Sequence, residues 1–236
     1  MDFLHELVHG RGYCLVEADD RSCLYQLNEL LLKVAARDGN VTDTDGIEGL
    51  RKQITTLPES NINSLNMKLS ACPDFSSILV NAFAGAVREI AGDELFLQRR
   101  AHVMFNTSDT RHTRAMPHFD GMSGISPFAI TIWVPAHDVH DDSGIWVLDQ
   151  EKSMELVRKE SKNKRIMGED LLGMDSLKPL QIDFGCGVLF NPFVMHGAYP
   201  HTGSLARIGV STRFQSRAQP LFIRNSEFFY PYDILD

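Results

Sequence analysis

Hydrophobic residues recur at helical spacing through much of the first 94 residues. After Asp20, a residue type that favours a helix N-cap, leucines spaced by three and four positions predict a helix. A second apolar stripe over residues 73–90 predicts a helix that packs on a sheet. The segment GYCLVEA, residues 12–18, alternates weakly and predicts a first strand, whereas residues 41–60 are polar and their structure stays open.

From Leu95 onward, the pattern changes to short segments rich in β-branched and aromatic residues. One helix, over residues 150–162, is expected among them. The segments of strand length are LQRRAHVMFN (97–106), SPFAITIWVP (126–135), SGIWVLD (143–149), LQIDFG (180–185), GVLFNP (187–192) and ARIGVSTRF (206–214). Because many short strands follow helices, we expect an α+β fold, mainly β, with a jelly-roll or barrel whose N-terminal helices pack on one sheet.

The length of 236 residues suits a single domain with a sizeable core. Within it, we expect residues 1–94 to form a mainly helical support region and residues 95–236 to form the β core. No apolar run reaches the roughly 18 residues of a membrane helix. The N-terminus lacks the basic and apolar regions of a secretory signal. We therefore expect a cytoplasmic protein without a membrane partner.

Charge and cysteine usage narrow the function classes. The 31 acidic residues exceed the 23 basic ones and give a net charge of −8, which argues against nucleic acid as a partner. An anionic small molecule remains compatible, because one local arginine can outweigh the net field. The four cysteines show no CxxC spacing, so we expect reduced thiols: Cys14, Cys23, Cys72 and Cys186.

Two metal-capable side chains, His118 and Asp120, are separated by one residue. On an extended chain, positions i and i+2 point to the same face, so both can reach one ion. His196 follows 76 residues beyond Asp120. Two histidines and one carboxylate form the facial triad of non-heme iron(II) oxygenases, in which the remaining coordination positions stay open. We therefore predict His118, Asp120 and His196 as metal ligands and catalytic residues.

A His-x-Asp triplet alone is weak, because a surface His–Asp pair is the simpler interpretation. The chain also contains a competing cluster around His137 and His140. The composition of that segment is typical of an exposed turn, and we favour a solvated loop there. His112 and His201 lie in polar sequence and are interpreted in the same way.

Arg207 falls eleven residues after His196, in the segment ARIGVSTRF. A strand arginine is the natural clamp for the distal carboxylate of 2-oxoglutarate, because its guanidinium binds a carboxylate bidentately and stays charged. The alternative is a surface arginine on an edge strand. Parity places Arg207 and Arg213 on one polar face, with the apolar residues of the segment on the other. Of the two, we expect Arg207 to lie near the metal and Arg213 to extend towards the far rim.

Other residues are weaker candidates for the cosubstrate site. Alternation places one polar row on a single face of the segment 98–106, and this row either lines a cavity or faces solvent. The row comprises Gln98, Arg100, His102, Met104 and Asn106. Thr131 and Trp133 share a face on the next segment, although a core tryptophan is equally compatible with the pattern. We include Asn106, Thr131 and Trp133 as candidate cofactor-binding residues.

Taken together, these pieces resemble the phytanoyl-CoA dioxygenase-like branch of the iron(II)/2-oxoglutarate oxygenases. The matching pieces, in order, are GYCLVEA, PHFD, FAITIWVPAHD, DDSGIWVL and GCGVLFNPFVMHGAYPHTGSLARIGVSTRF. The resemblance implies a double-stranded β-helix, iron(II) as cofactor and 2-oxoglutarate as cosubstrate. It also implies an oxidoreductase that uses molecular oxygen to hydroxylate a small molecule, with release of succinate and carbon dioxide.

The segments MKLSACPDFSSILVNAFAGAVREIAGDELFLQRR and GMSGISPF are similar to oxygenases from bacterial carbohydrate-biosynthesis clusters. That similarity implies a sugar or a sugar-bearing metabolite as substrate. Two departures concern the site. Residues 149–153 read DQEKS where the family often has Pro-Gly-Ser-His, which weakens an acyl-CoA substrate. Ala198 replaces a small hydroxyl residue. Halogenating relatives have a small residue in place of the carboxylate of the His-x-Asp triplet, so that chloride can bind. Because Asp120 is present, the resemblance favours hydroxylation.

Two other functions are compatible with parts of the pattern. A non-catalytic jelly-roll, such as a sugar-binding module, would not need a facial triad together with a carboxylate clamp. A zinc hydrolase could use the same three ligands but would not need Arg207.

Overall fold

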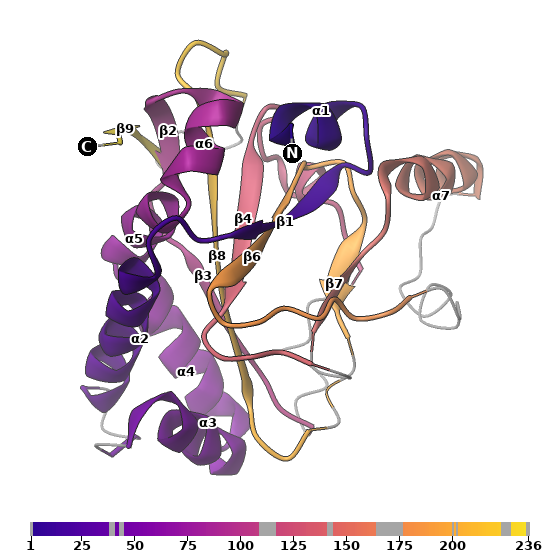
Figure 1. The fold of residues 1–236 in the computed structure, drawn as a ribbon. Helices are drawn as coiled ribbons and strands as arrows, with labels where there is room; N and C mark the ends of the chain where they lie inside the picture. Colours follow the sequence, from indigo (N-terminus) through magenta and orange to yellow (C-terminus); the bar gives the residue numbers. More distant parts are fainter. Residues whose placement is uncertain are drawn as a thin grey trace.

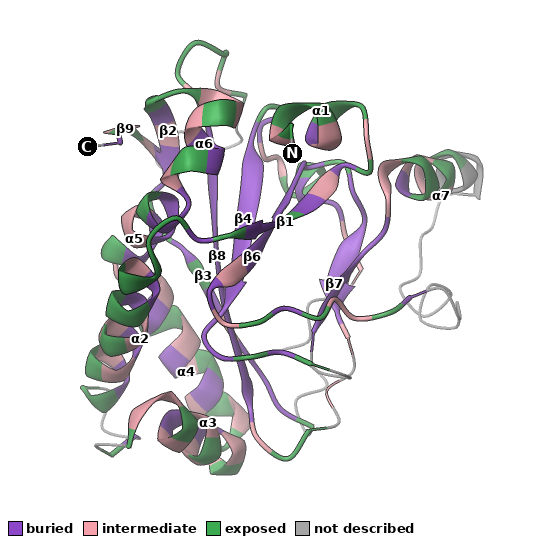
Figure 2. Ribbon diagram, in the orientation of Figure 1, coloured by how far each residue is buried: buried purple, intermediate pink, exposed green. Residues whose placement is uncertain are grey.

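The computed structural model packs most of its N-terminal helices on one side of an antiparallel sheet (Figure 1). Strands run through the centre of the molecule, and the buried residues follow them (Figure 2). The structure describes residues 2–37, 41–42, 45–108, 117–140, 144–163, 177–199, 201, 203–222 and 228–234, with side chains of the helix that ends at 163 described up to 158.

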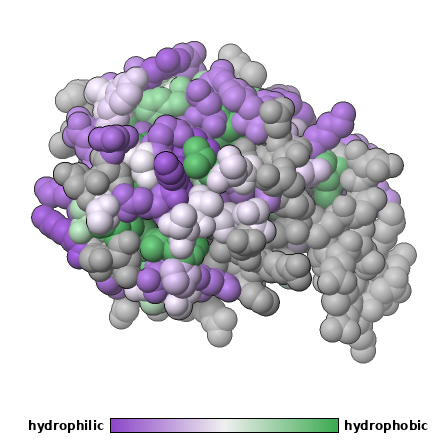
Figure 3. All heavy atoms as spheres, turned by 90° about the horizontal axis from the view of Figure 1, so that it is seen from below, coloured by the Kyte–Doolittle hydropathy of each residue, from purple (hydrophilic) through white to green (hydrophobic). Residues whose placement is uncertain are grey.

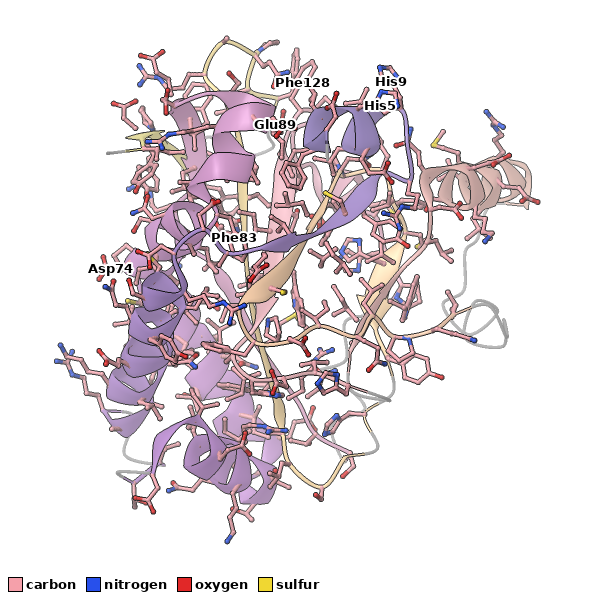
Figure 4. The ribbon with its side chains drawn as sticks, in the orientation of Figure 1. His5, His9, Asp74, Phe83, Glu89 and Phe128 are labelled. Atoms are coloured by element: carbon pink, nitrogen blue, oxygen red, sulfur yellow. The ribbon has the colours of Figure 1, made fainter. Side chains whose placement is uncertain are left out.

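In the described part of the chain, six helices precede the second strand. They are α1 (Phe3–Val8), α2 (Arg21–Ala36), α3 (Gly46–Thr56), α4 (Glu59–Ser70), α5 (Asp74–Ala82) and α6 (Ala84–Ala91). Helix α1 is tied to α6, because the backbone N–H of Phe3 donates to Glu89 (Figure 4). Helix α3 and the start of α4 occupy the stretch 41–60, whose structure the sequence left open.

The helix expected after Asp20 is confirmed as α2. The Asp20 carboxylate accepts the backbone N–H of Ser22 at 2.8 Å and so caps the first turn. The predicted leucine stripe is buried against the rest of the core: Leu24, Leu27 and Leu31.

The single helix predicted over residues 73–90 is wrong in one respect, because it breaks at Phe83 into α5 and α6. The cause is Asp19, which packs beside the break. Its backbone N–H donates to the carbonyl of Ala82 at 2.8 Å, and its carboxylate accepts a hydrogen bond from the N–H of Gly85 at 2.7 Å. Phe83 is itself fully buried (Figure 4). These hydrogen bonds to Asp19 therefore interrupt the helix, although the apolar stripe in the sequence continues through the break.

One large sheet has the order β1-β6-β4-β8-β2-β9, with β3 also paired to β8, and every pairing is antiparallel. Its strands are β1 (Tyr13–Glu17), β2 (Glu94–Gln98), β3 (His102–Asn106), β4 (Ile130–Pro135), β6 (Cys186–Phe190), β8 (Arg207–Ser216) and β9 (Phe229–Asp233). The strand predicted over 12–18 is therefore confirmed as β1, at the edge of a sheet whose other strands come from residues 94–233. Helix α5 packs on the outer face of β8, where Thr212 donates to Ser76 at 2.8 Å.

Two strand predictions need correction. The segment 97–106 forms two strands, β2 and β3, because the chain bends between Gln98 and His102 and both pieces pair with different parts of β8. The segment 180–185 contributes only an isolated bridge between Ile182 and Val139. The predicted helix over 150–162 is confirmed as α7 (Gln150–Asn163).

A second, two-stranded sheet pairs β5 (Ile145–Val147) with β7 (His196–Ala198). It packs on the large sheet through a buried cluster that combines residues of both: Trp133, Ile145, Val147, Ile182, Val188, Phe190 and Val194. The fold is thus a mixture of helices and antiparallel sheet, in which the two sheets meet over an apolar layer.

Among the described residues, no helix is long and apolar enough to cross a membrane. On the face seen from below, the described residues are mainly hydrophilic, with small hydrophobic patches among them (Figure 3).

Candidate metal centre

The three predicted ligands converge. Nε2 of His118 lies 3.7 Å from Oδ1 of Asp120, and Nε2 of His196 lies 3.9 Å from the same oxygen. Ligand atoms from all three residues fall within 4.8 Å of one another. Asp120 is 1% exposed, whereas the His118 side chain is 34% exposed towards the cavity described below.

Local backbone pairing produces this convergence. His118 and His196 form an antiparallel β-bridge with two backbone hydrogen bonds of 3.0 Å, so their side chains project to the same side. Phe119 is extended, and its ring enters the apolar cluster around Trp146. The alternation predicted for the His-x-Asp triplet therefore holds, although Asp120 already begins the 3₁₀ helix η1 (Asp120–Ser123).

The charge states suit metal binding. Burial acts to raise the pKa of Asp120, but the adjacent Arg213 guanidinium outweighs it and holds that pKa well below its usual value. Burial lowers the pKa of His196 to about 4. Its Nδ1 faces the carbonyl of Val194 at 3.1 Å, an acceptor only, so Nδ1 carries the proton and Nε2 keeps its lone pair for an ion. A carboxylate and a neutral imidazole are the forms that bind metals.

Arg213 binds Asp120 directly, which the sequence did not predict. Nη2 lies 2.6 Å from Oδ1 and Nε lies 2.8 Å from Oδ2, a bidentate ion pair. The hydroxyl of Thr131 donates to Oδ2 at 2.6 Å. The expectation that Arg213 extends towards a far rim is wrong, because its register partner on β4 is Thr131, directly beneath Asp120.

The donor set fits a divalent ion. Two ligands at right angles and about 2.1 Å from an ion are about 3 Å apart, so the two distances from Asp120 to the histidines need to shorten by less than about 1 Å. Oδ1 of Asp120 accepts one hydrogen bond in the described structure, and a carboxylate oxygen has a second lone pair to offer. With one carboxylate and two imidazoles on one side, the other coordination positions are left to small molecules.

The competing histidines lie elsewhere, as predicted, but His137 does not lie in a solvated loop. It is buried, and its Nε2 accepts the backbone N–H of Ile208 at 3.2 Å. His140 is exposed and lies 3.3 Å from Asp183, in a second metal-capable group together with Asp138. All three members of that group are exposed, a common arrangement on acidic surfaces.

Arg207 lines a narrow inner cavity of about 50 Å³ that reaches the triad. The residue is 1% exposed, and its Nη1 donates to the carbonyl of Gly144 at 2.8 Å. Burial lowers the pKa of Arg207 to about 10, which leaves it charged at neutral pH. Around it, the cavity is lined by residues that include Thr131, Trp133, Phe190, His196, Ser211 and Arg213.

The parity of β8 is confirmed. Arg207, Ser211 and Arg213 face the inner cavity, while Ile208, Val210 and Phe214 are buried in the main core. Trp133 lies across this face, because a Cβ on Gly209 would meet its ring at 2.7 Å, and the Arg207 guanidinium is 5.7 Å from the ring centre. Glycine at position 209 therefore makes room for the tryptophan that walls the cavity.

A larger outer cavity of about 840 Å³ opens beside the triad. Four of the five residues in the polar row line it, which resolves the alternative that the sequence left open. Asn106 does not line either cavity; it is buried opposite Arg207 in the β3–β8 pairing. The outer cavity is lined by Ser70, Gln98, Arg100, Ala101, His102, Met104, His118, Asp120, Ser123, Gly124, Ile125, Arg213 and Phe228.

Comparisons with solved structures show a shared fold at low sequence identity. ThoJ, a non-heme monooxygenase solved as a nickel complex, has a TM-score of 0.52 and 14% identity, over 90% of this chain and 77% of that chain. HygX from Streptomyces hygroscopicus, solved with nickel and 2-oxoglutarate, has a TM-score of 0.55 and 12% identity, over 92% and 89%. SnoN, an α-ketoglutarate-dependent epimerase of nogalamycin biosynthesis, has a TM-score of 0.52 and 14% identity, over 90% and 81%. No protein-family model and no curated protein matches the sequence.

The buried Arg213–Asp120 pair predicts a large stability effect. Arg213→Ala is expected to lower the free energy of unfolding of the metal-free protein by about 3–5 kcal/mol, because it leaves a buried carboxylate without its counter-ion. Arg217→Ala, which removes an exposed pair with Asp233, is expected to cost less than about 1 kcal/mol. Urea unfolding of both variants measures the difference, and equal losses would contradict the assigned role of Arg213.

Buried His137 predicts an acid-sensitive stability. Burial lowers its folded pKa to about 4, against about 6.5 in an unfolded chain. Below about pH 6.5 the His137 imidazole is protonated in the unfolded chain but stays neutral in the folded protein, so the free energy of unfolding falls as the pH drops towards 4. His137→Gln is expected to reduce this pH dependence, whereas His140→Gln at the surface is not. Denaturation of the metal-free protein at pH 7 and pH 5 tests this, and an unchanged slope in His137→Gln would contradict it.

Proposed function

We propose that the protein is an iron(II)- and 2-oxoglutarate-dependent oxygenase. The observation that carries this proposal is the convergence of His118, Asp120 and His196 beside an inner cavity that contains the buried cation Arg207. Neither a metal triad nor a buried arginine alone would favour this chemistry over others. Together they offer one ion and one diacid adjacent places in the same small space.

In this proposal, the triad residues hold iron(II) from one side. The Val194 carbonyl fixes the ring of His196, and Thr131 with Arg213 fixes the carboxylate of Asp120. Iron(II) with bound 2-oxoglutarate supplies oxidation of a substrate C–H bond by molecular oxygen, with release of succinate and carbon dioxide.

Arg207 is the proposed partner of the distal carboxylate of 2-oxoglutarate. Its guanidinium is shielded from water, which strengthens a charged hydrogen bond. Trp133 packs beside it and restricts the cavity to a slender ligand. Thr131 stays a proposed contributor through Asp120, whereas Asn106 does not line the inner cavity. Solved structures of the same fold include one with 2-oxoglutarate and nickel bound, which supports the proposal by analogy of fold.

The finer features of the fold and the substrate belong to the same proposal. In this proposal, the large sheet and the β5–β7 sheet together form the expected double-stranded β-helix, and the phytanoyl-CoA dioxygenase-like family is the proposed relationship. The proposal also includes a single domain and a cytoplasmic location. Its substrate is a sugar or a sugar-bearing metabolite that is hydroxylated during biosynthesis. Epimerisation is a second candidate outcome, because a solved structure of this fold is described as an epimerase.

Two rival functions give different results in one assay. Purified protein is mixed with iron(II), 2-oxoglutarate and oxygen, and succinate is measured across a panel of sugars and sugar derivatives. The oxygenase predicts iron-dependent succinate that rises with one class of sugar. A zinc hydrolase or a non-catalytic sugar-binding module predicts no succinate above the level of a His118→Ala variant.

A further inference from the structure

The outer cavity has an unusual charge for this protein. The chain as a whole has a net charge of −8, yet the described residues that line the cavity include two arginines and a single acid, Asp120. That acid is already engaged by Arg213 and is the proposed metal ligand. The second arginine, Arg100, is therefore a cation with no counter-charge on the described walls of the cavity.

Arg100 also differs from most of the other described arginines near the surface. Arg11, Arg21, Arg51, Arg88 and Arg217 each pair with a carboxylate, and Arg99 lies 5.4 Å from the ring of Tyr230. Within the described part of the chain, Arg100 pairs with no carboxylate and contacts no aromatic ring, and its side chain is exposed. Its position, at the bend between β2 and β3, directs it to the same cavity as His118.

The other walls define what else a ligand would meet. Ser70, Gln98 and Ser123 offer polar groups, while Met104, Ile125 and Phe228 offer apolar surface. His102 lines both the outer and the inner cavity, so it marks the junction between the two. Burial lowers the pKa of His102, so this junction is a neutral imidazole at neutral pH.

We propose that the outer cavity binds an anionic small molecule, whose carboxylate or phosphate group is held by Arg100 while its remainder extends towards His118. This inference rests on the proposed function and names the substrate class for that site. A concave surface focuses the field of an unpaired cation, which allows the cavity to attract an anion despite the acidic surface elsewhere. The substrate of the proposed hydroxylation is thus a small molecule that carries an acid group.

Nuclear magnetic resonance of the side-chain Nε–H groups of arginine tests this directly. Inorganic phosphate and, separately, acetate are titrated into the metal-free protein, and the Arg100 signal is identified by its loss in Arg100→Gln. Arg37 provides a matched control, because it is exposed, lies at the end of α2 and has no ion pair or aromatic contact in the described structure. Arg99→Gln controls for the neighbouring position.

We expect the Arg100 signal to saturate at anion concentrations at least about tenfold lower than the Arg37 signal, since a walled cation gains more from a charged hydrogen bond. A response to phosphate alone indicates a phosphate-bearing substrate, and a response to both anions indicates general carboxylate or phosphate recognition. Equal responses at Arg37 and Arg100, or none at Arg100, would overturn the proposal. Because no metal is present, the result is independent of iron and 2-oxoglutarate binding, whose failure would count against the proposed function alone.

Discussion

Replacing Asp120 with alanine is expected to weaken binding of iron(II) or nickel(II) by more than about a hundredfold. Loss of a residue that only supports a metal ligand typically costs ten- to a hundredfold in affinity, so loss of the single carboxylate ligand costs more. Asp120 donates the oxygen that lies between both histidines, 3.7 and 3.9 Å from their Nε2 atoms. Nickel titration followed by calorimetry measures the effect.

A companion variant separates metal binding from folding. Asp120→Ala leaves Arg213 buried without its partner and therefore also destabilises the protein. His118→Ala is gentler, because that side chain is 34% exposed, and it should show a similar loss of nickel. Asp183→Ala, in the exposed second group, serves as the control and should retain full affinity. If Asp183→Ala loses the metal while His118→Ala keeps it, the metal centre has been assigned to the wrong group.

Replacing Arg207 with alanine is expected to raise the 2-oxoglutarate concentration needed for binding by about a hundredfold or more. A charged bidentate hydrogen bond inside a dry cavity contributes on the order of 3 kcal/mol, and Arg207 is 1% exposed. Nickel affinity should be nearly unchanged, because Arg207 supplies none of the three ligand atoms of the triad. Titration of 2-oxoglutarate into the nickel-loaded variant provides the measurement.

Arg213 offers the alternative clamp, since it also lines the inner cavity. Its Nε and Nη2 donate to Asp120 and its Nη1 donates to Gln98 at 3.1 Å, so all three of its nitrogens already have a partner. Arg207→Lys, which keeps the charge but not the bidentate geometry, should fall between alanine and the wild type. Unchanged 2-oxoglutarate binding in Arg207→Ala, with loss in a folded Arg213→Lys, would transfer the role to Arg213.

Much of the site could be predicted because its key residues are set by local rules. The separation of His118 and Asp120 by one residue places both on one face of an extended chain, and the structure preserves that geometry through Phe119. Alternation along β8 likewise separated the cavity face of Arg207 from the core face of Ile208. Each of these inferences needed only the period of one element.

The features that the sequence did not indicate depend on partners far away in the chain. The Arg213–Asp120 pair follows from the register of β4 against β8, which no local pattern specifies. The break at Phe83 follows from Asp19, which lies 66 residues before the glycine that it caps. His137 belongs to a turn by composition, but β8 covers it through Ile208. Tertiary pairing, and not propensity, decided each case.

Anaerobic mixing of the protein with iron(II) and 2-oxoglutarate tests the central claim most directly. If His118, Asp120 and His196 hold iron and Arg207 orients 2-oxoglutarate beside it, a visible charge-transfer band should form. The band should be absent in His118→Ala and should require far more 2-oxoglutarate in Arg207→Ala. No band in the folded wild-type protein, or an equal band in His118→Ala, would contradict the proposed oxygenase site.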